Sequence, residues 1–169
     1  MSPDENTPLD QDSLSSPDAG SQELAEQVAQ LIRLVRSGEE ANIELAFLIS
    51  KGLGNPAPFG QYLQDLLPLY KLAFESKRKK LDTAALAELF GLTEFAISER
   101  ELTELPENLG QLQNLLELDC DYNQLQSLPE SLAVLPKLKK LDARNNPLTH
   151  IPTALRQKQG LELLVDEPK

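Results

Sequence analysis

The chain has 169 residues, a mass of 18.7 kDa and a formal net charge of -11, which is material for one domain with accessory segments. This acidity argues against the clustered Lys and Arg side chains that nucleic acid or an anionic membrane requires, so we expect neither as a partner. The single cysteine cannot form an internal disulfide, and Cys and His do not occur at metal-ligand spacing. We therefore expect no metal, no cofactor and a cytoplasmic location.

Residues 1–20 form the first segment, which holds five acidic residues, no basic ones and three prolines. Its sizeable apolar side chains are Leu9 and Leu14, too few to offset the entropy cost of ordering, so the composition predicts a disordered acidic tail. It also lacks the basic start and apolar run of a secretion signal. Two roles stay open for this tail, a solubilising leader and a short acidic docking segment.

Residues 21–68 are predicted to form three helices. The first begins with Ser21 as its N-cap and ends at Gly38. The second spans about residues 42–51, and the third ends near Pro68, because proline disfavours helix in the residue before it. Four apolar side chains share one face of the first helix: Leu24, Val28, Leu31 and Val35.

The C-terminal half repeats itself at an interval of 23 residues. We expect three full units, residues 92–114, 115–137 and 138–160, and a truncated fourth unit, residues 161–169. In the fourth unit Asp166 falls where a leucine belongs, so a charged final strand is expected to end the array. The clearest equivalent leucines are Leu115, Leu138 and Leu161, and Leu118, Leu141 and Leu164.

The second unit, LLELDCDYNQLQSLPESLAVLPK, resembles the leucine-rich repeat. The pattern LxxLxLxxN falls on Leu115, Leu118, Cys120 and Asn123, and the unit length and the LPxxL element resemble the short intracellular class. The resemblance covers residues 92 to about 166. The chain departs from the pattern at four places, where Arg100 replaces the repeat asparagine, Cys120 and Ala143 replace leucines, and Lys158 replaces the last leucine of the third unit.

The pattern of apolar and polar residues within the unit also predicts this architecture. Apolar and polar residues alternate around Leu118, as a half-buried strand requires. The second half of each unit, which contains the LPxxL element and is called here the return segment, is expected to point its leucines inward. Asn123 and Asn146 are expected to bond the backbone of neighbouring coils in a short ladder. The expected fold class is therefore α/β: a short right-handed leucine-rich-repeat solenoid with parallel strands on its concave face and an N-terminal α-helical cap.

Residues 69–91 are expected to cap the first coil. Leu69, Leu72 and Phe74 precede equivalent positions of the first unit by one period, which predicts a capping strand over residues 69–74. A helix then follows, with Asp82 as its N-cap and Gly91 as its end. An alternative keeps residues 69–74 helical. The earlier helices would then cover the open end of the solenoid.

The candidate binding surface consists of the strand residues that point away from the leucines, called here the strand face. Its charge changes from negative in the first two units to net positive in the third, and complementary potentials steer protein encounters. The competing interpretation is that exposed strand positions of any soluble repeat protein are polar. The strand face comprises Glu94, Ala96, Ser98, Glu117, Asp119, Asp121, Lys140, Asp142 and Arg144, with Tyr122 and Asn145 at its rim.

Residues suited to catalysis or metal binding are few. His150 is the only histidine, and no Ser or Cys is placed by the repeat to meet it. Cys120 stands at a core position, and Glu117, Asp119 and Asp121 lack the turn oxygens of a calcium site. The KRKK run, residues 77–80, is interpreted as a solvated turn.

We therefore expect a monomeric, non-enzymatic module that binds a protein partner by its strand face, its helical cap, or both. The alternative is a regulatory protein in which the helical region, residues 21–67, is active and the repeats are a scaffold. A bacterial effector or enzyme, which the resemblance also allows, is disfavoured. The chain has no GxxxxGK phosphate loop and no catalytic Cys in a separate domain.

Overall fold

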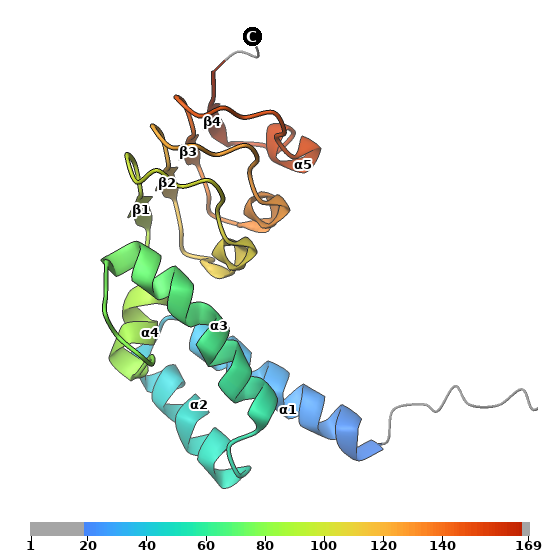
Figure 1. The fold of residues 1–169 in the computed structure, drawn as a ribbon. Helices are drawn as coiled ribbons and strands as arrows, with labels where there is room; N and C mark the ends of the chain where they lie inside the picture. The colour runs from blue at the N-terminus through green and yellow to red at the C-terminus, as the bar shows by residue number, and fades with distance from the viewer. Residues whose placement is uncertain (1–18, 167–169) are drawn as a thin grey trace, which may run out of the picture.

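The computed structural model describes residues 19–166, so most of the predicted acidic tail lies outside the described residues. A helical region is followed by a stack of short strands (Figure 1). The helices are α1 (Ala19–Arg36), α2 (Glu40–Gly52), α3 (Ala57–Phe74) and α4 (Thr83–Phe90). The strands are β1 (Glu94–Ala96), β2 (Glu117–Asp119), β3 (Lys140–Asp142) and β4 (Glu162–Leu164). The return segments contain the 3-10 helices η1 (Glu107–Gln111) and η2 (Glu130–Val134) and the short helix α5 (Thr153–Arg156).

The first helix begins earlier than predicted. Ala19 and Gly20 are helical, so they do not belong to the tail, and Ser21 lies inside α1 and is not its N-cap. The chain leaves α1 at Gly38, which has a φ of 72°. A Cβ atom there would stand 3.0 Å from the backbone of Phe90. Glycine therefore permits both the turn and the close approach of α1 to the end of α4.

The capping strand predicted over residues 69–74 is wrong, because these residues complete α3, and α3 does not end near Pro68. The spacing of Leu69 and Leu72 fits one helical face as well as it fits the repeat period. Leu69 and Tyr70 are buried, and the Tyr70 hydroxyl donates a 2.7 Å hydrogen bond to Glu88. This packing outweighs the backbone hydrogen bond that the exposed Pro68 cannot donate.

The helix predicted after this segment is confirmed as α4. Asp82 is its N-cap, and the Asp82 carboxylate accepts a 2.9 Å hydrogen bond from the backbone N–H of Ala85. This bond satisfies one of the free N–H groups at the start of the helix. Gly91 directly follows the last helical residue. None of the helices within residues 19–166 is long and apolar enough to cross a bilayer.

The four strands form one parallel sheet in the order β1-β2-β3-β4. The first two steps from one strand to the next follow the 23-residue period, since Glu94 is in register with Glu117 and Glu117 with Lys140. The last step is one residue shorter, because Lys140 is in register with Glu162, 22 residues later.

This shorter step corrects the fourth unit. Leu163, and not Leu164, is the equivalent of Leu141, so Asp166 does not take a leucine position. The third return segment differs from the others, with the α-helical turn α5 in place of a 3-10 helix. Lys158 stands where the earlier units have their closing leucine, and its Nζ instead donates a 3.0 Å hydrogen bond to the carbonyl of Ala133. The segment therefore closes one residue early.

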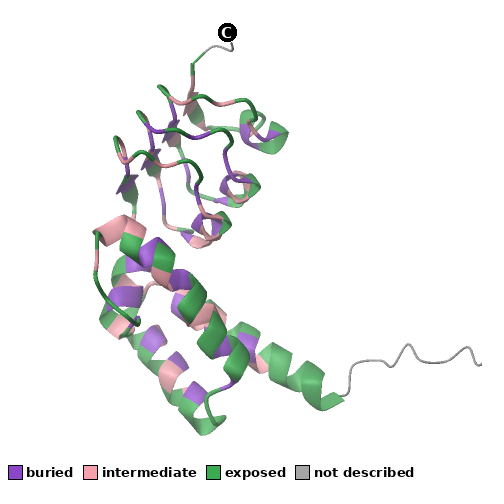
Figure 2. Ribbon diagram, in the orientation of Figure 1, coloured by how far each residue is buried: buried purple, intermediate pink, exposed green. Residues whose placement is uncertain are grey.

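One apolar core runs through the helices and the repeats (Figure 2). The predicted asparagine ladder is confirmed. Asn123 accepts 3.0 Å hydrogen bonds from the backbone N–H groups of Arg100 and Leu102, and Asn146 accepts one from Leu125. The side-chain amide of each asparagine also donates to carbonyl groups of its own coil and the preceding one.

Side chains of the first repeat connect the helical region to the sheet. Arg100 donates a 2.8 Å hydrogen bond to the carbonyl of Leu72 in the last turn of α3 and forms a 3.1 Å ion pair with Glu75. A guanidinium group suits the partial negative charge of a helix C-terminus. Asn114 similarly donates to the carbonyl of Phe90 at the end of α4. The N-terminal helices thus cover the first repeat, in agreement with a helical cap.

Candidate protein-binding surface

The register of the sheet sets the strand-face residues in rows across the strands. Glu94, Glu117 and Lys140 form one row, and Ala96, Asp119 and Asp142 form the next. The ladder continues beyond the strand ends, since the N–H of Ile97 bonds the carbonyl of Asp119 at 2.8 Å. The third row is Ser98, Asp121 and Arg144. The structure therefore brings all nine predicted strand-face residues together on one side of the sheet.

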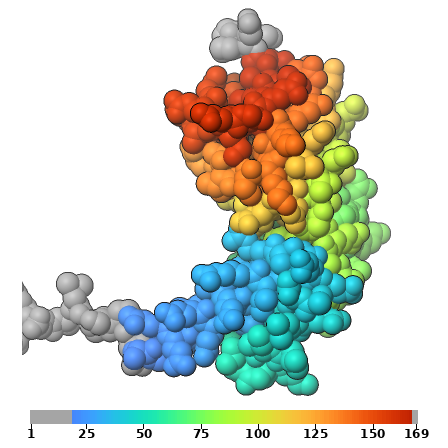
Figure 3. Space-filling view, turned by 180° about the vertical axis from the view of Figure 1, so that it is seen from behind, coloured from blue at the N-terminus to red at the C-terminus, as the bar shows by residue number. Residues whose placement is uncertain are grey.

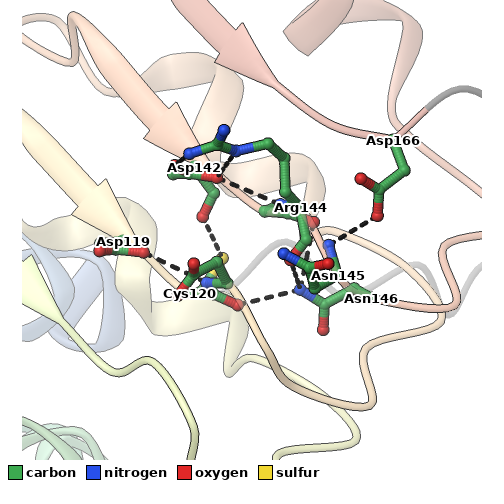
Figure 4. Close-up of polar contacts among 9 residues, drawn as sticks. Asp119, Cys120, Asp142, Arg144, Asn145, Asn146 and Asp166 are labelled. Atoms are coloured by element: carbon green, nitrogen blue, oxygen red, sulfur yellow. Dashed lines mark hydrogen bonds and ion pairs between the residues drawn. The ribbon is translucent and has the colours of Figure 1, made fainter.

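Asp142 and Arg144 form an ion pair within the third repeat (Figure 4). Arg144 Nε and Nη2 donate hydrogen bonds of 2.9 and 2.5 Å to the two carboxylate oxygens of Asp142, and the Arg144 backbone N–H donates a third. These bonds lower the pKa of the Asp142 carboxyl, although its burial acts in the opposite direction. The same contact raises the pKa of Arg144. The positive charge of Arg144 is thus compensated by its own repeat.

This pairing changes the predicted charge pattern of the strand face. Lys140 is the other strand-face cation of the third repeat, and it forms no ion pair within residues 19–166. The short third step also brings Glu162 into the row of Lys140, and the Asp166 carboxylate accepts a 2.6 Å bond from the N–H of Asn145 (Figure 4). The reversal of sign at the third repeat is therefore smaller than the residue types alone indicate.

Two repeats carry carboxylates that no cation of the described chain pairs with. Glu94 and Glu117 are exposed, and Asp119 and Asp121 are half-buried. Asp119 accepts a 3.2 Å bond from the backbone N–H of Asp121, the same turn that Asp142 forms with Arg144. Because an aspartate replaces the arginine in the second repeat, this turn lacks a guanidinium group. We call these four residues, Glu94, Glu117, Asp119 and Asp121, the acidic patch.

Tyr122 stands beside the acidic patch and is 58% exposed. Its φ is 49°, and the equivalent residues Glu99 and Asn145 also have positive values of 58° and 56°. Each coil therefore needs a left-handed backbone conformation at this position. Asparagine adopts this conformation readily, whereas it is costly for a residue with a bulky side chain. Tyr122 therefore places an exposed aromatic ring at a backbone position where a bulky side chain is costly.

Cys120 lies beneath the strand face and belongs to the core, as predicted. Its thiol donates a 3.3 Å hydrogen bond to the carbonyl of Asp142 (Figure 4). Burial raises its pKa to about 12, and the nearby carboxylates of Asp119, Asp142 and Asp121 add to this effect. The thiol is therefore protonated at neutral pH and does not act as a nucleophile.

The other candidates for chemistry stand apart from the strand face. His150 is exposed, and its Nε2 lies 3.9 Å from a carboxylate oxygen of Glu130 on η2. Among residues 19–166, His, Cys, Asp and Glu side chains do not form a group of three or more that could hold a metal ion.

Reasoning from the sequence missed two residues of this surface, Glu162 and Leu164. A fixed period of 23 residues displaced the last strand by one position, which exchanges its two faces. The available signal was Lys158, whose charge breaks the leucine pattern at the point where the third unit shortens.

A match to one family model supports the repeat assignment. Residues 137–157, which include β3 and α5, match the family model described as Leucine Rich Repeat. A solved structure of a leucine-rich repeat protein from Leptospira interrogans is similar to part of the chain, with 27% sequence identity and a TM-score of 0.43. The similarity covers 55% of this chain and 29% of that one, so the chain spans less than a third of that protein's length. No curated protein matches.

Proposed function

Because this chain is a leucine-rich repeat protein, we propose that it is an interaction module whose strand face binds a basic surface or segment of a partner protein. In this proposal the chain performs no chemistry of its own. The fold leaves the choice of ligand to the exposed side chains, whose charge and placement determine what binds.

The observation that carries the proposal is the acidic patch, whose carboxylates form no ion pair within residues 19–166. Glu94 and Glu117 are directly in register on neighbouring strands, which in a sheet lie about 4.8 Å apart. Like charges placed opposite each other destabilise a sheet. A lysine or arginine of a partner that lies between these carboxylates removes the repulsion, so binding relieves a cost that the free protein bears.

Tyr122 gives the proposed surface an aromatic contact next to Asp121. A basic side chain can pack over the tyrosine ring while its charge meets the carboxylate, and such cation–π contacts contribute about 0.5–1 kcal/mol at exposed sites. Lys140, in register with Glu117, sets the border of the acidic patch and disfavours a partner that is basic along its whole length.

Charge reversal of the two exposed glutamates tests this proposal. The double variant Glu94→Lys, Glu117→Lys keeps two like charges in register and changes their sign, so we expect a similar fold and loss of the partner. Tagged wild-type and variant chains are expressed in cells, and the captured proteins are quantified by mass spectrometry. The matched control Glu104→Lys, Glu130→Lys makes the same charge change on the return segments.

We expect the strand-face variant to reduce capture of the specific partner at least tenfold and the control to leave it unchanged. Equal capture by the wild-type chain and the strand-face variant would show that the strand face is not the binding surface.

A second candidate places the active surface on the helical region, because Leu45 and Leu48 of α2 are exposed. Under this alternative the repeats are a scaffold, and substitutions on α2 change the captured proteins while the strand-face variant does not.

A further inference from the structure

Helix α2 has apolar side chains on two opposite faces. Its inner face, with Ile43, Ala46 and Ser50, is buried against the helical region. On the outer face Leu45 is 44% exposed and Leu48 is 68% exposed. In the view of Figure 3, part of the segment of residues 40–52 lies at the surface of the helical region, below the repeats. Ala41 and Gly52, both exposed, extend the outer face by one turn at each end.

This outer face has the same order of side-chain sizes in both directions. Along the helix, a small residue is followed by two leucines and then by a second small residue: Ala41, Leu45, Leu48 and Gly52. Its midpoint falls between Ala46 and Phe47. If a second α2 is placed antiparallel about a twofold axis at this midpoint, Leu45 meets Leu48 of the second copy. Ala41 then meets Gly52 of the second copy, and small residues at both ends let the helices approach closely.

The charges on the flank of the outer face fit the same arrangement. Glu40, Glu44 and Lys51 lie on one side of the leucines and are exposed, and none of them forms an ion pair within residues 19–166. With a rise of about 1.5 Å per residue, Lys51 of the second copy falls level with the gap between Glu40 and Glu44, about 3 Å along the axis from each. In a parallel twofold pair this flank of one copy would lie on the opposite side of the contact from the same flank of the other, so these opposite charges would not meet.

We propose that the chain forms a twofold-symmetric dimer in which α2 packs antiparallel against α2 of a second copy. The contact is self-complementary, as a closed dimer requires. The contact extends over only one helix of 13 residues. It therefore buries less area than the roughly 800 Å² per partner of a standard interface, and we expect the dimer to be weak. A monomer is the expectation from the sequence, where the outer face of α2 cannot be distinguished from its core face.

The dimer leaves both strand faces free, because the sheet lies at the other end of the molecule from α2 (Figure 1). A dimer with two strand faces binds a partner that carries repeated basic segments more tightly than a single chain does. The dimer stands on α2 alone and does not depend on the proposed function of the strand face.

Sedimentation equilibrium of the full chain tests the dimer, over concentrations from about 1 μM to about 1 mM. We expect the weight-average mass of the wild-type chain to rise from 18.7 kDa toward twice that value. Leu48→Glu places a charge at the centre of the contact, so this variant stays monomeric throughout. The control Val134→Glu changes a side chain of η2 that is 71% exposed, and this variant should dimerise as the wild-type chain does.

Charge variants test the antiparallel register separately from the apolar contact. Lys51→Glu should weaken the dimer at least tenfold, because it sets the new carboxylate of each copy against two glutamates of the other. Adding Glu40→Lys and Glu44→Lys to this variant reverses every charge on the flank and should restore the wild-type dissociation constant.

Three results would each overturn the proposal. These are a wild-type chain that remains monomeric at about 1 mM, a Leu48→Glu variant that still dimerises, and a triple charge variant that stays as weak as Lys51→Glu. Circular dichroism checks that each variant keeps its fold, which the exposure of all the substituted side chains favours.

Discussion

Asn123 connects two coils of the repeat through a single side chain. Its Oδ1 atom accepts bonds from the N–H groups of Arg100 and Leu102, and its Nδ2 atom lies within 3.1 Å of three carbonyl oxygens. The sequence predicts this role, because an asparagine at a fixed place after each strand has backbone groups of two coils within reach. The Asp142–Arg144 pair could not be predicted in the same way. Residues two apart share one face of a strand, but whether they pair depends on the turn that follows the strand.

We expect Asn123→Ala to lower the free energy of unfolding by about 2–4 kcal/mol, because backbone groups of the core lose their partner. Asn146→Ala should cost less, since Asn146 accepts one backbone bond and is only half-buried. Urea denaturation monitored by circular dichroism measures both values. An equal loss in the free energy of unfolding for the two substitutions would contradict the greater role of Asn123.

Asp142 makes stability depend on pH, because its pKa is depressed in the folded chain. The carboxylate contributes stability above the unfolded-state pKa of about 3.9, and this contribution is lost as pH falls through the lower folded-state pKa. Asp142→Asn removes it. We expect the wild-type chain to melt at a higher temperature than this variant at neutral pH and the difference to shrink below about pH 4. A difference that stays constant across the acidic range would show that Arg144 does not hold the carboxylate.

At the scale of elements, the same leucine spacing supported a correct and an incorrect assignment. The repeat period located β1 to β3, because at those positions alternating polar residues favour a strand. It also predicted a strand at residues 69–74, where Tyr70 is buried in α3 and its hydroxyl donates a hydrogen bond to Glu88 of α4. Residue spacing alone does not distinguish these cases, since tertiary contacts decide between them. The error in β4 had a different cause, the loss of one residue from the third unit.

Pro68 offers a test of the α3 assignment. It is exposed inside the helix and cannot donate a backbone hydrogen bond, so Pro68→Ala adds one bond without disturbing the core. We expect the free energy of unfolding to rise by about 1–2 kcal/mol, after allowing for the greater freedom of alanine in the unfolded chain. Urea denaturation gives the value. No gain, or a loss, would indicate that residues 69–74 are not helical in solution.

At the scale of the whole molecule, helices and repeats share one core and are joined by polar contacts at the first repeat. The sequence predicts that helices cover the open end of the stack, because leucines of an end coil need a partner. It also shows Arg100 as a departure from the repeat pattern. A single sequence gives no sign of what Arg100 touches, since Leu72 and Glu75 lie 28 and 25 positions away in the chain and become its neighbours only through folding.

We expect Arg100→Lys to weaken this junction by about 1–2 kcal/mol, because an ammonium group cannot bond the Leu72 carbonyl and the Glu75 carboxylate in the same fork geometry. Hydrogen exchange resolved by mass spectrometry locates the effect. Amide exchange should become faster in β1 and in the last turn of α3, while β3 exchanges as in the wild-type chain. Uniform acceleration across all strands would mean that Arg100 does not act at the junction.

Binding of a basic region of a partner protein by the strand face would bring that region next to Tyr122. The most direct test of this binding is a photo-crosslinking amino acid placed at position 122, which preserves an aromatic side chain at the rim of the acidic patch. The matched control carries the same group at position 134, an exposed position on the return side. After irradiation in cells, we expect a specific crosslink from position 122 to a Lys- or Arg-rich segment of one protein, and none from position 134. Crosslinks from position 134 alone, or from neither position, would contradict the proposed binding.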